Sequence, residues 1–447
     1  MTIEIYSLGG YEEVGKNMTA VKVDDEIILL DMGIHLDPLM ALEEKGLKPE
    51  EPNLTNEGVL PDDKPIQKMK DNVKAIVISH AHLDHCGAVE YMAKRYDAPV
   101  IGTPFTMEFL RNSMPHKKFN RINTVTMEAG EKVDVGKTEV EFVHLTHSTP
   151  QTVHTALHTP EGIVYYASDF KFDNSQALTK PPDYKRMKKL GKEGVEVAIV
   201  ESVGSEEYNK TPGEVIAREM LKDTLTTTIN DTNGILVTSF SSHIERLNSI
   251  QEAAKKLDRK VSFCGRSLAK YIKVAEAVGI KKFPNLDVMG RQKAMKKVFK
   301  KAAKNKQDHL IVVTGGQGEP RAILSRIVNG DYSYKIERED QVIFSCRTIP
   351  TPINIQNRHK LEENIISQGG RVFRDVHVSG HADREDHRDL IKRLNPKNLI
   401  PCHGDIQKLA AYADLASEEY NQNTGENYKL GDNIHLLRNG QKKIFNN

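Results

Sequence analysis

The sequence predicts an α/β protein in which one α/β domain is inserted into another. Short apolar runs rich in β-branched residues, such as residues 73–79, predict buried strands. Between residues 234 and 345 these runs alternate with segments of helical spacing, the pattern of parallel βαβ units. A chain of 447 residues is also too long for a single hydrophobic core and suits two or three domains.

The same patterns place the individual elements. In the outer parts of the chain, strand-like runs lie at 1–6, 73–79, 141–148, 162–169, 195–200 and 398–405. In the middle part, strands are predicted at 234–240, 260–265, 309–316 and 341–345, with a helix at 241–256. Because functional residues of α/β proteins collect where strands end, the residues that follow these runs are the first candidates for a site.

Composition limits the class of protein. The chain is 38% hydrophobic with a formal net charge of +1, and it has no long uncharged apolar run, so we expect a soluble protein that is not inserted in a membrane. The first six residues already alternate like a strand, so no signal peptide is expected. Four scattered cysteines without a CxxC motif fit free thiols in a reducing cytoplasm. With so little net charge, polyanion binding requires local basic patches.

The most informative stretch is residues 80–85, His-Ala-His-Leu-Asp-His, directly after the predicted strand at 73–79. Three imidazoles and a carboxylate packed this closely are costly to hold together unless a cation compensates them. Imidazole suits zinc and similar transition metals, and the added carboxylate can help to hold a second ion. The sequence therefore predicts a metal site at the end of this strand.

This stretch resembles the HxHxDH signature of the metallo-β-lactamase superfamily, which implies an αββα sandwich and further ligands downstream. Residues of the expected type occur in order at His147, Asp169 and His403. By this resemblance, His80, His82 and His147 hold one metal ion, Asp84, His85 and His403 hold a second, and Asp169 bridges them. Two divalent ions are implied, with Zn²⁺ favoured by the imidazoles and Mn²⁺ or Mg²⁺ as alternatives.

Four further motifs narrow the resemblance to the β-CASP nucleases, and among them to the ribonuclease J family in its short archaeal form. They are Phe240–Arg246, Cys264–Ser267, Thr314–Pro320 and His377–Ala382. The similarity covers nearly the whole chain. It implies a metallo-β-lactamase domain in two parts, residues 1–205 and 372–447, and an inserted β-CASP domain at 206–371.

The resemblance also implies an activity. It predicts a metal-dependent ribonuclease that hydrolyses phosphodiester bonds of single-stranded RNA in RNA maturation and decay. The main mode would be 5′-to-3′ exonuclease action with preference for a 5′-monophosphate end. The family commonly forms homodimers, so we expect a homodimer. The scattered free thiols add the expectation that it is cytoplasmic.

Particular residues receive roles from this resemblance. Asp84 would orient the nucleophilic water as well as bind metal, and His381 would protonate or stabilise the leaving oxygen. Glu201 would orient a ligand or His381, although a carboxylate that merely closes a strand is an equally simple interpretation. A strand leading into Ser379-Gly380 would present backbone N–H groups to RNA phosphates. The predicted substrate-binding residues are His377, Val378, Ser379, Gly380 and His381, with Ser239 at the terminal 5′ phosphate.

Three alternatives stay open at this stage. The first is an endoribonuclease like the β-CASP enzymes that process mRNA 3′ ends, and the second is an RNA-binding scaffold without activity. A small-molecule thioester hydrolase is a more distant third, because it would not need the insert. Separately, residues 291–306 combine an apolar stripe with lysines on the opposite face, which fits either an RNA-binding surface or a merely solvated helix face.

Overall fold

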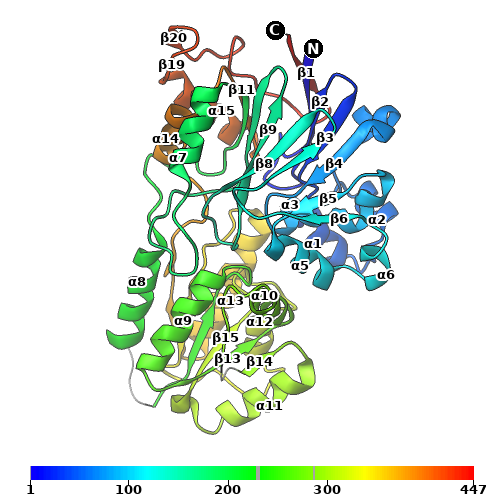
Figure 1. Ribbon diagram of the computed structural model, residues 1–447. Helices are drawn as coiled ribbons and strands as arrows, with labels where there is room; N and C mark the ends of the chain where they lie inside the picture. Colours follow the sequence, from blue (N-terminus) through cyan, green and yellow to red (C-terminus); the bar gives the residue numbers. More distant parts are fainter. Residues whose placement is uncertain (1, 228–231, 285–286, 447) are drawn as a thin grey trace. The chain divides into compact units, whose positions relative to one another are not determined.

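The computed structural model describes residues 2–227, 232–284 and 287–446 (Figure 1). It divides into two compact units. Unit 1 contains residues 1–172, 181–211 and 380–447, and unit 2 contains residues 173–180 and 212–379. The short segment 173–180 joins unit 2 because Ala177 and Leu178 donate backbone N–H bonds of 2.8 and 2.9 Å to Glu245. The sequence-based boundaries at 205/206 and 371/372 stay a prediction.

Unit 1 is built on two mixed sheets. The first has the strand order β21-β1-β2-β3-β4-β5-β6. Its strands are β1 (Thr2–Gly9), β2 (Met18–Val23), β3 (Glu26–Leu30), β4 (Val73–Val77), β5 (Val100–Gly102), β6 (Thr124–Thr126) and β21 (Lys442–Asn446). The second has the order β18-β11-β10-β9-β8-β7. Its strands are β7 (Lys132–Val135), β8 (Thr138–His144), β9 (Val153–Thr159), β10 (Gly162–Ala167), β11 (Val195–Glu201) and β18 (Asn398–Cys402).

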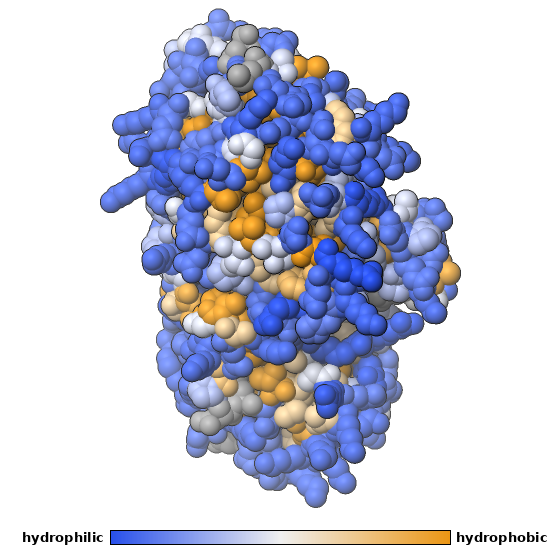
Figure 2. All heavy atoms as spheres, turned by 45° about the vertical axis from the view of Figure 1, so that its right-hand side comes forward, coloured by the Kyte–Doolittle hydropathy of each residue, from blue (hydrophilic) through white to orange (hydrophobic). Residues whose placement is uncertain are grey.

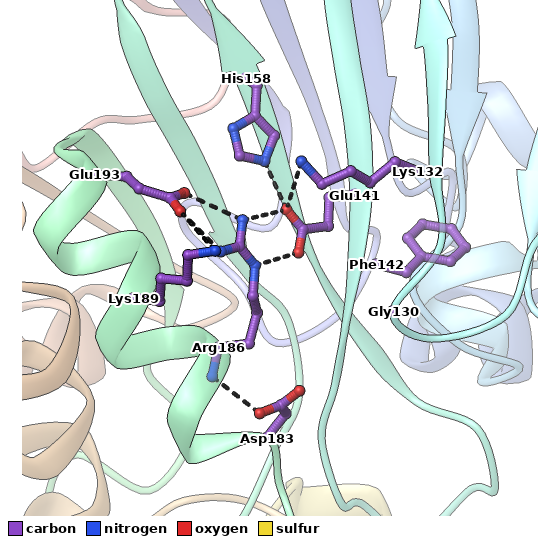
Figure 3. Close-up of a pocket in the computed structure, with 9 residues that line it drawn as sticks. All are labelled: Gly130, Lys132, Glu141, Phe142, His158, Asp183, Arg186, Lys189 and Glu193. Atoms are coloured by element: carbon purple, nitrogen blue, oxygen red, sulfur yellow. Dashed lines mark hydrogen bonds and ion pairs between the residues drawn. The ribbon is translucent and has the colours of Figure 1, made fainter.

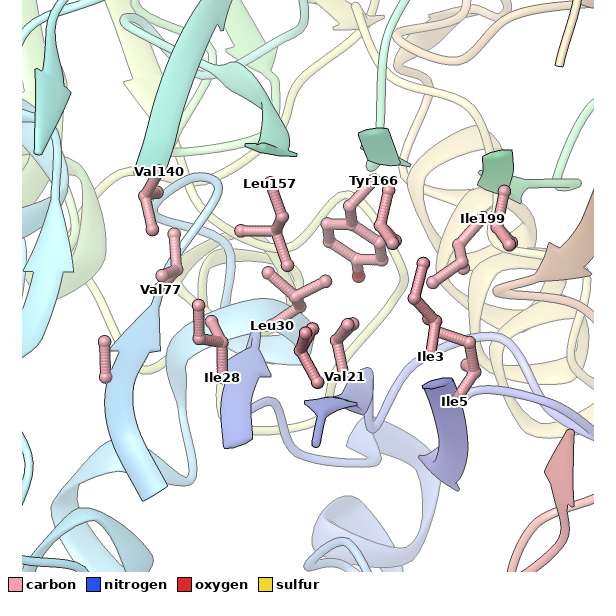
Figure 4. Close-up of a cluster of buried hydrophobic side chains, with 14 of the residues drawn as sticks. Ile3, Ile5, Val21, Ile28, Leu30, Val77, Val140, Leu157, Tyr166 and Ile199 are labelled. Carbon is pink, nitrogen blue, oxygen red and sulfur yellow. The ribbon is translucent and has the colours of Figure 1, made fainter. Parts of the chain in front are cut away.

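Side chains that alternate along these strands separate two cores. Ile28 and Leu30 of β3 and Val164 and Tyr166 of β10 belong to the core between the two sheets (Figure 4). The intervening residues of β10, such as Tyr165, point to the other face of the second sheet and join another core. The helices that contribute to this second core are α7 (Tyr184–Glu193), α14 (Arg384–Leu394) and α15 (Ile406–Ser417).

The remaining helices of unit 1 are short and follow strands of the first sheet. They are α1 (Leu36–Glu44), α2 (Glu51–Asn56), α3 (Leu83–Cys86), α4 (Val89–Met92), α5 (Pro104–Ser113) and α6 (His116–Phe119). A two-stranded ribbon, β19 (Tyr420–Asn421) and β20 (Glu426–Asn427), lies near the C-terminus. The two packed sheets with helices outside confirm the predicted αββα sandwich.

Unit 2 is a parallel α/β domain, as its alternating sequence pattern predicts. Its sheet has the order β14-β13-β15-β12-β16-β17, and all strand pairs among its described residues are parallel. The strands are β12 (Ile235–Thr238), β13 (Lys260–Cys264), β14 (Asp287–Met289), β15 (His309–Val313), β16 (Gln341–Phe344) and β17 (Arg371–Phe373). The helices are α8 (Glu214–Thr227), α9 (Ile244–Lys256), α10 (Arg266–Ala277), α11 (Gln292–Ala302), α12 (Ile323–Val328) and α13 (Pro352–Ser367). This confirms an inserted α/β domain.

One predicted element is wrong. No strand leads into Ser379-Gly380, because β17 ends at Phe373 and residues 374–379 have no regular secondary structure. β17 pairs with β16, and β16 ends at Phe344, so the ladder does not continue beyond Phe373; one backbone bond follows, from the Val376 N–H to the Phe344 carbonyl at 3.2 Å. Contacts other than a strand ladder therefore hold this segment.

Among the described residues, no helix is long and apolar enough to cross a membrane. On the face that Figure 2 shows, hydrophilic side chains cover most of the surface, interrupted by small apolar patches.

Candidate metal centre

The predicted metal-binding stretch lies in a loop and one helical turn after β4. His80 and His82 occupy the loop, and Asp84 and His85 lie in α3. Backbone bonds from Asn17 and Met32 to the carbonyls of Asp84 and His85, 3.0 and 2.8 Å long, hold this turn. Gly33 packs so closely that a Cβ there would lie 1.6 Å from the Asp84 carbonyl oxygen, so residue 33 must be glycine.

The other three candidate ligands come from the second sheet. His147 follows β8, Asp169 follows β10, and His403 follows β18. Parallel and neighbouring strands bring these ends to the same edge, where they meet the loop after β4. All seven side chains therefore lie together, as two overlapping groups: His80, His82, His147 and Asp169, and Asp84, His85, His403 and Asp169.

The first group has the spacing of a tetrahedral site. Nδ1 of His82 lies 3.0 Å from Nε2 of His80 and 3.1 Å from Nε2 of His147. Oδ2 of Asp169 lies 3.5 Å from each of those two Nε2 atoms. Donors about 2.0–2.1 Å from a tetrahedral zinc ion would be about 3.3 Å apart. The four donor atoms therefore fit one ion.

The second group uses the other oxygen of the same carboxylate. Oδ1 of Asp169 lies 3.2 Å from Nε2 of His85 and 3.4 Å from Nε2 of His403. Oδ2 of Asp84 lies 3.7 and 3.6 Å from the same two nitrogens. Both Asp169 oxygens are buried, and neither has a hydrogen-bond partner among the described residues. A buried carboxylate left in this state is costly unless cations bind it, so the residues fit a metal cluster.

Hydrogen bonds fix the tautomers of two candidate ligands. Nδ1 of His147 donates to the Gly380 carbonyl at 2.6 Å, and Nδ1 of His85 donates to Asp31 at 2.7 Å. Each bond places the ring proton on Nδ1 and leaves Nε2 with a lone pair directed at the cluster. A Cβ at Gly380 would lie 3.2 Å from Cε1 of His147, so this glycine permits the close approach.

Asp31 and Asn17 are functional candidates that the sequence analysis missed. Besides His85, the buried Asp31 carboxylate accepts bonds from the Ser79 N–H and hydroxyl at 2.8 and 2.9 Å and from the Tyr166 hydroxyl at 2.9 Å. The Asn17 amide nitrogen lies 2.9 Å from Nδ1 of His403 and 3.1 Å from Nε2 of His85. Asp31 ends the apolar run of β3 and has a positive φ of 59°, so its place at a strand end is the signal that could have identified it.

The electrostatics keep His82, His147 and Asp169 in their metal-binding forms. At His85, burial opposes the charged form, but the carboxylates of Asp169, Asp84 and Asp31 outweigh it and raise its pKa well above the usual value. Burial lowers the pKa of His82 to about 3, and burial likewise holds the pKa of His147 well below its usual value. Burial opposes ionisation of Asp169, but the neighbouring imidazoles of His85 and His403 outweigh it and lower its pKa well below the usual range. Neutral imidazoles and an ionised carboxylate are the forms that bind metal ions.

His381 and Asp84 lie on the open side of the cluster, with 25% and 18% of their side chains exposed. Nδ1 of His381 lies 3.8 Å from Oδ2 of Asp169 and 3.6 Å from Oε1 of Glu201. Burial disfavours the charged form of His381, but these carboxylates outweigh it and raise its pKa to about 9. Oε2 of Glu201 accepts the Val203 N–H at 2.8 Å, so the carboxylate is fixed beside the imidazole.

The predicted substrate-binding residues fall in both units. Gly380 and His381 belong to unit 1, whereas Ser239, His377, Val378 and Ser379 belong to unit 2. Ser239 directly follows β12, and its buried hydroxyl has no hydrogen-bond partner among the described residues.

A separate cleft of about 570 Å³ lies in unit 1 and shares no residue with the metal cluster (Figure 3). Its centre is a bidentate ion pair in which Nε and Nη2 of Arg186 donate to Glu141 at 2.5 and 2.8 Å. His158 lies 2.7 Å from the same carboxylate, and Glu193 engages the outer side of the guanidinium. The charged side chains at the centre of this cleft already pair with one another. We therefore interpret them as a network that stabilises unit 1 and not as a second binding site.

Comparison with known proteins gives three family matches. Residues 11–218 match the metallo-beta-lactamase superfamily, and residues 232–361 match the beta-CASP domain of ribonuclease J. Residues 371–426 match the RNA specificity domain of Zn-dependent metallo-hydrolases.

Full-length relatives agree with these matches. The chain is 44% identical to ribonuclease J of Methanocaldococcus jannaschii, over 100% of this chain and 99% of the relative. It is 43% identical to ribonuclease J of Pyrococcus abyssi, over 98% of this chain and 96% of the relative. A solved protein of unknown function from Enterococcus faecalis shares the fold, with a TM-score of 0.64 and 16% identity over the full length of both chains. With its two-unit architecture and converging histidines and carboxylates, this chain belongs to the ribonuclease J family of β-CASP metallo-β-lactamase proteins.

Proposed function

We propose that this protein is a metal-dependent ribonuclease that hydrolyses phosphodiester bonds of single-stranded RNA. The observation that carries this proposal is the convergence of six histidine and aspartate side chains on the carboxylate of Asp169, which belongs to both donor groups. Family membership supports RNA as the polymer, because the full-length relatives are named ribonuclease J. We further propose a role in RNA maturation and decay, in the cytoplasm and as a homodimer.

The centre would hold two divalent cations. We assign His80, His82 and His147 to one, Asp84, His85 and His403 to the other, and Asp169 to both. The five imidazoles favour Zn²⁺, and Mn²⁺ or Mg²⁺ suits the group that contains two carboxylates. When bound, such a pair of cations neutralises charge on the phosphate and lowers the pKa of a water from about 16 toward 7.

The protein's own residues would complete the reaction. Asp84, on the open side of the cluster, orients the attacking water and accepts its proton through its free oxygen. His381 holds a proton at an imidazole nitrogen and donates it to the leaving oxygen. Glu201 lies 3.6 Å from Nδ1 of His381 and keeps that ring protonated and oriented. Cations bound to Asp169 would weaken the attraction of this carboxylate for the proton on His381. They would thereby lower the pKa of His381 toward neutrality, where a general acid works best.

RNA binding would use both units. We propose that the segment from His377 to His381 contacts phosphates through its backbone N–H groups, imidazoles and hydroxyl. Ser239, whose buried hydroxyl has no described partner, would help to hold the terminal 5′ phosphate. We further propose 5′-to-3′ removal of nucleotides from a 5′-monophosphate end, a mode of action that fits membership of the ribonuclease J family. Ser239, the residue proposed to bind the 5′ end, would belong to the inserted domain at 206–371.

Two measurements test the proposal. Single-stranded RNA labelled at its 3′ end should be shortened progressively from the 5′ end, faster with a 5′ monophosphate than with a 5′ hydroxyl. Internal cuts unaffected by the end group would replace the exonuclease by an endoribonuclease of the 3′-end-processing type. Replacing His82 by Ala should remove one equivalent of metal and abolish cleavage. If an H82A protein of measured metal content cleaves RNA at a near-normal rate, the assignment of His82 as a metal ligand is wrong. If the unmodified protein binds RNA but does not cleave it, the protein is an RNA-binding scaffold.

A further inference from the structure

Helix α11 of unit 2 carries a strongly basic face that the proposed mechanism does not use. Met295, Val298, Phe299 and Ala302 pack into the core of unit 2. The opposite side carries exposed lysines on α11 and the following turn, here called the α11 lysine face: Lys293, Lys296, Lys297, Lys300, Lys301 and Lys304.

This face has no internal charge compensation. Residues 288–307 contain no aspartate or glutamate. Among the residues that the structure describes, none of the six lysines makes an ion pair. The nearest acidic residues along the chain are Asp287 and Asp308: Asp287 pairs with Lys260 at 2.9 Å, and among the described residues Asp308 forms no ion pair with any of the six lysines. By contrast, the basic residues of α8 and α14 have partners one turn away, as in the pairs Lys222–Glu219 and Arg388–Glu385.

Such an arrangement opposes helix stability. Lysines three or four positions apart are neighbours on a helix, and like charges at these spacings repel. The positions 293, 297 and 300 form one row, which rises about 10 Å along the helix axis. Burial lowers the pKa of His309, and the charge of Lys301 lowers it further, so the positive field of the face acts on groups beyond the helix. A surface of this kind is explained by an anionic partner that spans several turns.

We propose that the α11 lysine face binds the phosphate backbone of single-stranded RNA at residues distinct from those of the metal centre. The proposal rests on the proposed ribonuclease function, which makes RNA the polyanion at hand. Lysine is a flexible point charge that contacts phosphates without reading bases, so this surface would hold RNA of any sequence. It would raise affinity for long substrates without altering the chemistry of cleavage.

The test compares two triple variants that remove equal charge. K293Q/K297Q/K300Q neutralises one row of the face, and glutamine keeps the helix propensity of the segment. The matched control, K185Q/K188Q/K192Q, neutralises exposed lysines on α7 of unit 1, where acidic residues lie nearby. Binding of a 30-nucleotide single-stranded RNA is measured by fluorescence anisotropy across a salt series with chelator present, so that no turnover occurs.

The α11 variant should reduce the slope of log affinity against log salt by about 2, because each neutralised phosphate contact on single strands contributes about 0.7. The α7 control should keep the slope, and both variants should hydrolyse a 5′-phosphorylated dinucleotide at the unmodified rate. An unchanged slope in the α11 variant overturns the proposal. Loss of polyglutamate binding instead of RNA binding would overturn it in favour of an acidic protein partner. If the unmodified protein cleaves no RNA, the proposed function is refuted. The salt series would still show whether the α11 lysine face binds RNA.

A second and independent observation concerns the buried residue Arg246 of α9. Its guanidinium is fully buried, and Nη2 donates to Glu214 at 2.9 Å, while Nε engages the other oxygen of the same carboxylate. Nη1 lies 3.0 Å from both the carbonyl and the hydroxyl oxygen of Ser345. It also lies 3.3 Å from the Val376 carbonyl and 3.2 Å from Nδ1 of His377, in the segment after β17. The Ser345 hydroxyl also donates to the Val376 carbonyl at 2.8 Å. These contacts replace the strand ladder that residues 374–379 lack.

The chemistry of arginine decides the state of His377. A guanidinium has only donors, so a proton on Nδ1 of His377 would face the Arg246 cation at 3.2 Å, and this contact favours an unprotonated Nδ1. A neutral ring then carries its proton on Nε2. We infer that Arg246 is a positioning residue that fixes the Nε2–H tautomer of His377 and so presents a hydrogen-bond donor for RNA phosphate. This inference rests on the proposed substrate-binding role of His377.

Nitrogen-15 spectra of the histidine rings test the tautomer without any activity measurement. The His377 signals, identified as those that disappear in H377N, should show a protonated Nε2 and an unprotonated Nδ1. A proton on Nδ1 would overturn the inference even if the protein is an active ribonuclease.

Kinetics test the positioning role with a matched control in the same unit. Arg358 forms a comparable buried pair with Glu362, with Nε 2.5 Å from Oε1. R246K should raise KM for RNA about tenfold or more, with a smaller change in kcat, because an ammonium cannot bond Glu214 and His377 together. R358K should leave KM near the unmodified value. Equal KM changes in both variants would reduce Arg246 to a structural role.

Discussion

Oδ2 of Asp31 accepts a hydrogen bond from Nδ1 of His85 at 2.7 Å, and both side chains are almost fully buried. The pair forms a carboxylate–histidine unit in which the far nitrogen, Nε2, faces Asp84 and Asp169. Partners of this kind orient a ligand and raise its basicity. The metal affinity of the second donor group therefore depends on Asp31, which is not itself a candidate ligand.

Replacing Asp31 by Asn should lower the affinity of the centre for its metal by about 10–100-fold, because the amide cannot supply the charge that supports His85. Competition with a calibrated chelator measures this affinity. Asp63 offers a control, since it is a buried carboxylate that accepts bonds of 2.8 Å from Arg95 and Tyr96. D63N should keep the metal affinity, and equal losses in both variants would argue against a specific role for Asp31.

Replacing Gly380 by Ala should slow RNA cleavage by about tenfold or more, because the new methyl group would press on His147 and displace a ligand. The predicted contacts are 3.2 Å to Cε1 of His147 and 3.2 Å to Cβ of Ser148. Initial rates at saturating RNA provide the measurement. G290A, whose Cβ would lie 3.1 Å from Cβ of Ala269 in unit 2, is the matched control and should retain full activity.

Replacing His381 by Ala should reduce kcat by about 10²–10⁴, the usual contribution of a general acid. Both metal ions should stay bound, because His381 lies beside Asp169 at 3.8 Å without belonging to either donor group. Single-turnover rates combined with elemental analysis separate the two effects. Loss of both ions from H381A would show that the ring is structural.

The Glu141–Arg186 pair should make stability depend on pH in the acid range. Burial opposes ionisation of Glu141, but hydrogen bonds from Arg186 and His158 outweigh it and lower its pKa to about 2. A carboxyl with a lowered folded-state pKa stabilises the protein fully above its unfolded value of 4.5, and this contribution is lost as pH falls toward 2.

Urea unfolding of E141Q and the unmodified protein measures this effect. At pH 7 the variant should be less stable by at most about 3 kcal/mol, reduced by solvent at the rim of the cleft. The difference should shrink steadily below pH 4.5. A difference that stays constant down to pH 3 would show that the ionised carboxyl contributes nothing specific.

Local pattern was enough to find the strands, and together with the resemblance to the metallo-β-lactamase signature it gave the seven candidate ligands. Residues 73–79, 162–169 and 398–405 are apolar runs with a ligand-type residue at or just after the end, and β4, β10 and β18 lie within them. A buried strand requires apolar side chains at almost every position, and a metal site requires histidine or carboxylate at its end. Both requirements concern residues that are close together in the chain, so they can be recognised in the sequence itself.

Other features were decided only by tertiary structure. Asp31 reaches His85 across 54 positions, and Arg246 reaches His377 across 131 positions. A lone aspartate at a strand end and a lone arginine in a helix have no local pattern that distinguishes them from surface residues. A strand was predicted to lead into Ser379-Gly380, but a strand needs a neighbour that continues alongside it, and β16, the partner of β17, ends at Phe344. The chain thus encodes which residues can bind metal, whereas packing decides which buried partners orient them, because hydrogen bonding is a property of pairs brought together in space.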